Sequence, residues 1–189
     1  VGVSYCFLRF VYAMLDAGVT SWQFVRYYFF FPTFVSGPIM TPAAFLSQSP
    51  RLNRSDLLEG FARIVYGVVK LGFSFLVQLF VPLAHTTHTY IAAQNYSAAV
   101  LWASLFLCGV WLYLNFSAFT DIAIGVACLF GIRVPENFNN PFAATDLTDF
   151  WRRWHITLGD WLRVNVFNPV TRPLSKILPG QSLVLAIVP

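Results

Sequence analysis

Charged side chains are scarce in this 189-residue chain, with 12 basic and 8 acidic residues making up 11% of the total. A soluble domain carries roughly 25%. Apolar and aromatic residues account for 57% of the chain. This composition excludes a soluble globular domain and predicts an integral membrane protein surrounded by lipid.

Cysteines and runs of basic residues are also sparse. The three cysteines lie in apolar stretches, at Cys6, Cys108 and Cys128. Their odd number and surroundings predict small buried side chains, so we expect neither a disulfide framework nor a metal site. Because the basic residues form no tract, the net charge of +4 favours basic cytoplasmic loops over nucleic-acid binding.

The longest stretch without any charge covers residues 71–120, which is enough for two bilayer crossings. We expect membrane segments at 3–17, 22–39, 61–84 and 98–116, the last running on to residue 132. Pro32 and Pro38 predict that the second segment is broken or re-entrant. Ser55 is the expected N-cap of the third. The fold class is therefore all-α and polytopic, with about four to five membrane helices.

Small residues at the end of the fourth segment, Gly125, Ala127 and Gly131, predict close contact with another helix. The neutral loop 85–97 is expected outside, and the loops rich in arginine are expected in the cytoplasm. His85 and His88 in the outer loop lack further metal ligands nearby, which favours a solvated loop.

A single amphipathic helix is expected after the N-cap Asp146, running to about residue 162. Three tryptophans recur at helical spacing, and Asp149 and Arg153 form an i,i+4 pair on the other side. This pattern is typical of a helix that lies in the membrane interface.

His155 is the candidate for acid–base chemistry, on the border between the tryptophan and arginine faces of that helix. The same position also fits an interfacial histidine bonded to a backbone carbonyl. Lys70 and Asp121 are ionisable groups within membrane segments and could pair with each other, while Asn115 is a third intramembrane polar group. For these residues, a structural and a functional role both stay open.

Three stretches together resemble the central block of the membrane-bound O-acyltransferase family. They are residues 115–125 (NFSAFTDIAIG), 129–142 (LFGIRVPENFNNPF) and 148–158 (TDFWRRWHITL). Residues 30–39 (FFPTFVSGPI) are similar to a segment of the branch that holds alginate O-acetyltransferases and D-alanyl-teichoic-acid transfer proteins.

The resemblance implies a ring of helices around a tunnel, of which residues 1–189 would be the central part, truncated at both ends. It implies transfer of an acyl group, expected to be acetyl, from a cytoplasmic thioester to a hydroxyl of an extracytoplasmic polysaccharide or envelope polymer. No bound cofactor is implied; acetyl-CoA or an acyl carrier protein would be the co-substrate. We expect the bacterial cytoplasmic membrane as its location, with acceptor polymer and envelope proteins as partners.

By resemblance, His155 matches the histidine of the family's Trp-Arg-Arg-Trp-His motif. The residues around it would bind the donor or line the tunnel, namely Asp149, Trp151, Arg152, Arg153 and Trp154. A second family histidine, in a Trp-His-Gly run, has no counterpart before Pro189, so we expect the fragment alone to be inactive. The alternatives are a polytopic transporter and an inactive scaffold.

Overall fold

The computed structural model describes residues 2–15, 18–34, 36–50, 52–79 and 97–177. The described part is helical, apart from one isolated bridge between two residues. The α-helices are α1 (Gly2–Leu15), α2 (Ser21–Tyr28), α3 (Pro42–Leu46), α4 (Arg54–Leu79), α6 (Ala98–Leu129), α7 (Leu147–Arg153), α8 (Ile156–Leu162) and α9 (Asn168–Ile177). Short 3-10 turns are η1 (Phe31–Thr33) and η2 (Pro141–Ala143), and a π-helical turn, η3 (Arg163–Phe167), joins α8 to α9.

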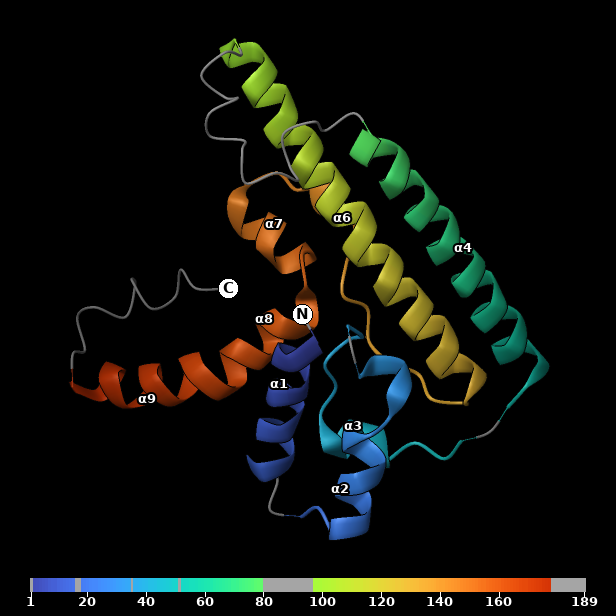
Figure 1. Ribbon diagram of the computed structural model, residues 1–189. Helices are drawn as coiled ribbons and strands as arrows, with labels where there is room; N and C mark the ends of the chain where they lie inside the picture. Colours follow the sequence, from blue (N-terminus) through green and yellow to red (C-terminus); the bar gives the residue numbers. More distant parts are fainter. Residues whose placement is uncertain (1, 16–17, 35, 51, 80–96, 178–189) are drawn as a thin grey trace.

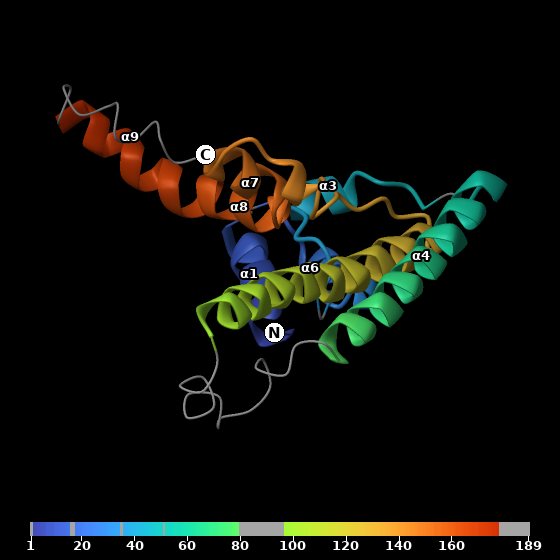
Figure 2. The same cartoon turned by 90° about the horizontal axis from the view of Figure 1, so that it is seen from above.

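Helices α4 and α6 form the long antiparallel pair of the fold, side by side in both views (Figures 1 and 2). Within the described ranges they are the two helices long and apolar enough to cross a membrane, at 26 and 32 residues. Helix α1 is apolar but shorter. The all-α fold is thus confirmed for these ranges, while the number of crossings and the ring stay predictions.

Glycines set the distance between α4 and α6. A Cβ on Gly125 would lie 2.7 Å from the backbone oxygen of Gly60, and one on Gly67 would lie 2.8 Å from the oxygen of Ala118. Only glycine, which has no side chain, allows the two backbones to come this close. Small residues play this role where helices approach each other in lipid. The predicted role of Gly125 is confirmed.

Gly131 has a different role, because it ends α6. It has a positive φ of 70°, and its N–H donates to the Cys128 oxygen while the Ile132 N–H donates to the Ala127 oxygen. These two bonds form a Schellman cap, which needs a left-handed residue. The prediction of a helix contact at Gly131 missed this role.

The predicted break in segment 22–39 is confirmed. Helix α2 ends at Tyr28, and Pro32 lies in η1. Arg9 of α1, 3% exposed, donates to the backbone oxygens of Tyr27 and Phe30 and to the Thr33 Oγ1. The two carbonyls also accept long bonds of 3.4 Å, from the Phe30 and Thr33 N–H groups. The buried arginine thus adds donors that stabilise the irregular backbone where the helix is interrupted.

The start of the third segment differs from the expectation. Helix α4 begins at Arg54, so Ser55 is a helical residue and not its N-cap. The N–H groups of Asp56 and Leu57 donate to the Asn53 oxygen, and the Asp56 carboxylate accepts from the Asn53 N–H. The reciprocal Asn53–Asp56 bonds start the helix at Arg54, two residues earlier than a cap at Ser55 would. His85 and His88 lie outside the described residues.

Candidate functional site: a bend at His155

The expected single amphipathic helix is two helices, with His155 at the bend between them. Asp146 caps α7 as predicted, its side chain accepting from the Asp149 N–H. Trp154 is then extended, with φ −100° and ψ 125°, and His155 is left-handed, with φ 45°. A left-handed conformation is rare for a residue with a side chain and marks local strain. The prediction that His155 lies on a helix face is wrong: it is the N-cap of α8.

A strand-like segment, residues 137–139, holds this bend from the other side. The Ile156 N–H donates to the Asn137 oxygen at 2.9 Å, and the Asn139 N–H donates to the Arg153 oxygen at 3.0 Å. Phe138 and Trp154 form the isolated antiparallel bridge. These bonds replace the helical ones that the break removes.

Asn137 also fixes the bend through its side chain. It is fully buried, and its Oδ1 accepts a hydrogen bond from the Thr157 hydroxyl at 2.5 Å. The Thr157 oxygen in turn accepts from the Ile39 N–H at 3.0 Å. This chain of bonds joins three sequence segments around His155. The stretch 129–142 carries part of the family resemblance, but its sequence gives no sign of this role of Asn137.

The imidazole of His155 lies between α1 and α6. Its Nε2 is 2.7 Å from the Tyr5 hydroxyl, and its Nδ1 accepts from the Leu158 N–H at 3.3 Å. The Phe116 ring packs against it with centroids 4.9 Å apart. Burial lowers the pKa of the His155 imidazole to about 4, so the ring is neutral at physiological pH.

The neighbouring tryptophans and arginines divide into buried and open members. Trp154 packs against Phe138 and Phe150 at 5.1 and 5.5 Å between ring centroids, whereas Trp151 is half exposed. Arg153 is held by Asp149 at 2.9 Å, as predicted, and this bond lowers the pKa of the Asp149 carboxyl. Arg152 is exposed, and no described residue pairs with it.

A second cluster joins α4 and α6. The expected pair is confirmed, with the Lys70 Nζ 2.6 Å from an Asp121 oxygen. Arg63, which could have extended to the cytoplasmic surface, contacts the other Asp121 oxygen at 3.3 Å and also pairs with Glu136. Two cations and two carboxylates therefore neutralise each other, and the buried Asp121 carboxylate has the cationic partners that a buried charge requires.

This ion cluster lines a polar cavity of about 140 Å³. Its wall includes Tyr113, Phe138 and Asn140, the last with a left-handed φ of 45°. Tyr113 also packs against Trp154 at 6.1 Å, so aromatic side chains connect the cavity with the bend. Asn115 is half-buried on α6 and is not among the residues that line this cavity.

One group of potential metal ligands occurs in the described ranges. Single ligand atoms of Asp56, Glu59 and Cys128 lie within 4.8 Å of one another. The Arg133 guanidinium contacts both carboxylates, at 2.6 and 3.3 Å. This arrangement fits an ion-pair network that ties the end of α6 to the start of α4. The described cysteines are free thiols.

The fold and site define a helical protein with two helices able to cross a membrane and a partly buried histidine at a constrained bend. Residues 10–188 match the model of MBOAT, the membrane-bound O-acyltransferase family. The chain therefore belongs to the membrane-bound O-acyltransferase family.

Among curated relatives, the chain is 34% identical over 143 residues to a probable alginate O-acetylase AlgI of Pseudomonas aeruginosa, covering 75% of this chain and 26% of the relative. It is 30% identical over 178 residues to a teichoic acid D-alanyltransferase of Bacillus subtilis, covering 88% and 44%. A peptidoglycan O-acetyltransferase of Helicobacter pylori is 30% identical over 167 residues, covering 84% and 31%. The chain thus spans between a quarter and somewhat under half of these relatives.

Proposed function

We propose that the protein containing this chain transfers an acyl group, acetyl in the first instance, from a thioester to a hydroxyl of a cell-envelope polymer. The family and the names of the relatives support this class of reaction. In the reaction, the hydroxyl oxygen bonds to the thioester carbonyl carbon and the carbon–sulfur bond breaks. The hydroxyl proton leaves to a base, and the thiolate takes up a proton.

The observation that carries the proposal is the way His155 is held. Because Nδ1 accepts from the Leu158 N–H, the proton of the neutral ring lies on Nε2 and is donated to the Tyr5 oxygen. The Tyr5 hydroxyl keeps its own proton, polarised by this bond. The pair can donate to the carbonyl oxygen that becomes negative as the thioester is attacked.

Both ring nitrogens are engaged in this arrangement, Nδ1 as the acceptor from Leu158 and Nε2 as the donor to Tyr5, so a base elsewhere accepts the hydroxyl proton. The arrangement therefore favours a role for His155 in holding and polarising the thioester over the acid–base role expected from the sequence. The left-handed backbone and the Asn137–Thr157 bonds keep the ring in place without reorganisation during the reaction.

Arg152 is proposed to bind the phosphate groups of the donor, acetyl-CoA or the prosthetic group of an acyl carrier protein. It is exposed and pairs with no described residue, whereas Arg153 is bonded to Asp149. A guanidinium that is not already paired can form the bidentate contacts that phosphate favours. Trp151, half exposed beside it, is proposed to seat α7 in the interface, and Trp154 to close the tunnel wall.

The site and its topology are proposed to operate in the bacterial cytoplasmic membrane, with the donor on the cytoplasmic side and the polymer, with any partner envelope proteins, outside. The ion cluster around Asp121 does not favour a transporter over this enzyme, because its charges are already paired.

The test is acyl transfer in membrane vesicles that contain the full-length protein. With a labelled acyl thioester and the acceptor polymer, His155→Ala should lower kcat at least 100-fold while membrane insertion is unchanged. Arg152→Ala should raise the KM for the donor about tenfold with little change in kcat. Arg163→Ala is the matched control, since Arg163 is an exposed arginine paired with Asp160. Normal turnover by His155→Ala would overturn the proposal.

A further inference from the structure

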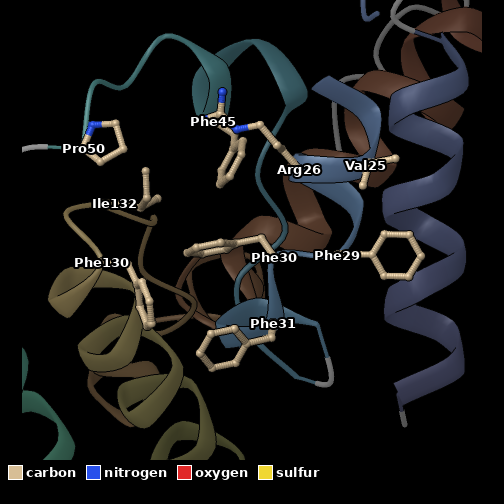
Figure 3. Close-up of a pocket in the computed structure, with 9 residues that line it drawn as sticks. All are labelled: Val25, Arg26, Phe29, Phe30, Phe31, Phe45, Pro50, Phe130 and Ile132. Atoms are coloured by element: carbon tan, nitrogen blue, oxygen red, sulfur yellow. The ribbon is translucent and has the colours of Figure 1, made fainter. Parts of the chain in front are cut away.

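An apolar groove lies at the end of the α4–α6 pair where α6 finishes. Its volume is about 460 Å³, within the range of pockets that bind small molecules. Its walls come from α2, η1, the segment around α3 and the turn after α6 (Figure 3). The lining residues are Val25, Arg26, Phe29, Phe30, Phe31, Phe45, Pro50, Phe130 and Ile132.

Arg26 is the single charged residue of this lining. Its side chain extends from α2 toward Phe45 (Figure 3). The side chain is exposed, and within the described ranges no carboxylate pairs with it. In sequence, residues 17–55 contain three arginines and no acidic residue. The carboxylates at the start of α4, Asp56 and Glu59, are held by Arg133.

The groove lies near the ends of the two helices that are long and apolar enough to cross a membrane. Phe130 and Ile132 follow the last residue of α6, and Pro50 precedes the start of α4, so a bilayer crossed by these helices would bring lipid phosphates close to the groove. Phe29 and Phe31 on its rim are 60% and 62% exposed. Aromatic side chains and arginines gather at this level because rings suit the interface and guanidinium groups reach phosphate.

We propose that this groove binds one anionic phospholipid, with an acyl chain along the phenylalanines and the phosphate at Arg26. The apolar lining suits a hydrocarbon chain. The Arg26 guanidinium, which no described carboxylate pairs, favours a headgroup with net negative charge over a zwitterionic one. The site is separate from the His155 bend and does not depend on acyl transfer.

The experiment compares lipids bound to the purified full-length protein by native mass spectrometry. Detergent-solubilised protein is mixed with equal amounts of phosphatidylglycerol and phosphatidylcholine. We expect one phosphatidylglycerol to be retained preferentially, and Arg26→Gln to reduce that preference about fivefold, the factor expected for one basic side chain at an anionic headgroup. Arg54→Gln is the matched control, since Arg54 is an exposed arginine outside the groove and should keep the preference.

A second variant tests the apolar part of the groove. Val25→Trp adds a ring at an exposed position of the lining and should reduce retention of both lipids, with thermal stability unchanged. Equal binding of the two lipids, or an Arg26→Gln protein that keeps the wild-type preference, would overturn the proposal. A cross-link from Phe31 to another segment of the protein would also overturn it, because the groove would then be filled by the protein itself.

Discussion

The Tyr5 hydroxyl and the His155 Nε2 are 2.7 Å apart, although 150 positions separate them in sequence. The contact links α1 to the bend between α7 and α8. The Tyr5 ring stacks on the His155 ring, and the Phe116 ring of α6 also packs against His155. The first helix is therefore part of the candidate site and more than a membrane anchor.

Tyr5→Phe removes the hydroxyl and keeps the ring. If the Tyr5–His155 pair donates to the developing oxyanion, kcat should fall about 10- to 100-fold while the KM for the acyl donor changes little. Steady-state kinetics of acyl transfer at saturating polymer provide the measurement. Tyr12→Phe is the control. Tyr12 lies on α1 like Tyr5, but its ring packs on Trp161 of α8 and not on His155. An unchanged kcat would assign Tyr5 a purely structural role.

Asn137→Ala removes the acceptor of the Thr157 hydroxyl and leaves that buried group unpaired. The expected loss of stability is about 1–3 kcal/mol, the usual cost of an unsatisfied buried polar group. Thermal unfolding in detergent measures it. If Asn137 also positions His155, kcat should fall more than KM changes, since the Ile39 N–H still reaches the Thr157 oxygen and only the link to Asn137 is lost. An unchanged kcat with the expected loss of stability would show that Asn137 acts on stability alone.

Much of the fold follows from local pattern. The long apolar helices α4 and α6, the break at the prolines after Tyr28 and the Asp146 cap rest on composition or on spacing along one segment, and each has its expected counterpart in the structure. The Lys70–Asp121 pair follows from the cost of an unpaired charge among apolar segments. Apolar length and helical periodicity are local properties, so a sequence alone carries them.

The bend at His155 could not be predicted in the same way. The periodicity of residues 147–162 continues through it, and nothing nearby in sequence breaks a helix there. The break is stabilised by Asn137 and Asn139, through bonds to Ile156 and Arg153 that span 19 and 14 positions of the chain. The role of Arg9 could not be predicted either, because its partners Tyr27, Phe30 and Thr33 come near it only in the folded chain.

The ion cluster predicts unequal effects for its members. Asp121→Asn removes the carboxylate shared by Lys70 and Arg63, and Lys70 then has no acidic partner among the described residues. This change should cost about 3–5 kcal/mol, as does breaking other buried pairs. Lys70→Met should cost less, since Asp121 keeps Arg63. The double variant should be more stable than Asp121→Asn alone. Thermal unfolding of the three variants tests this order, and equal losses for both single variants would contradict it.

Acidification should weaken the folded protein through His155. The unfolded imidazole takes up a proton below pH 6.5, while the buried ring stays neutral down to about pH 4. Between these values the unfolded state binds more protons, so stability falls as the pH is lowered through this window. At pH 5 this effect should lower the free energy of unfolding by about 2 kcal/mol relative to pH 7.

Unfolding temperatures measured from pH 7 to pH 4.5 in detergent, for wild type and His155→Gln, isolate this effect. Glutamine does not titrate, so the variant keeps only the pH dependence that arises from carboxylates and other groups. The wild type should therefore lose more stability than the variant between pH 6.5 and pH 4.5, even if the variant is less stable at pH 7. Parallel curves would mean that the His155 ring is protonated as easily in the folded protein as in the unfolded chain, and the buried neutral imidazole required by the Tyr5–His155 donor pair would be excluded.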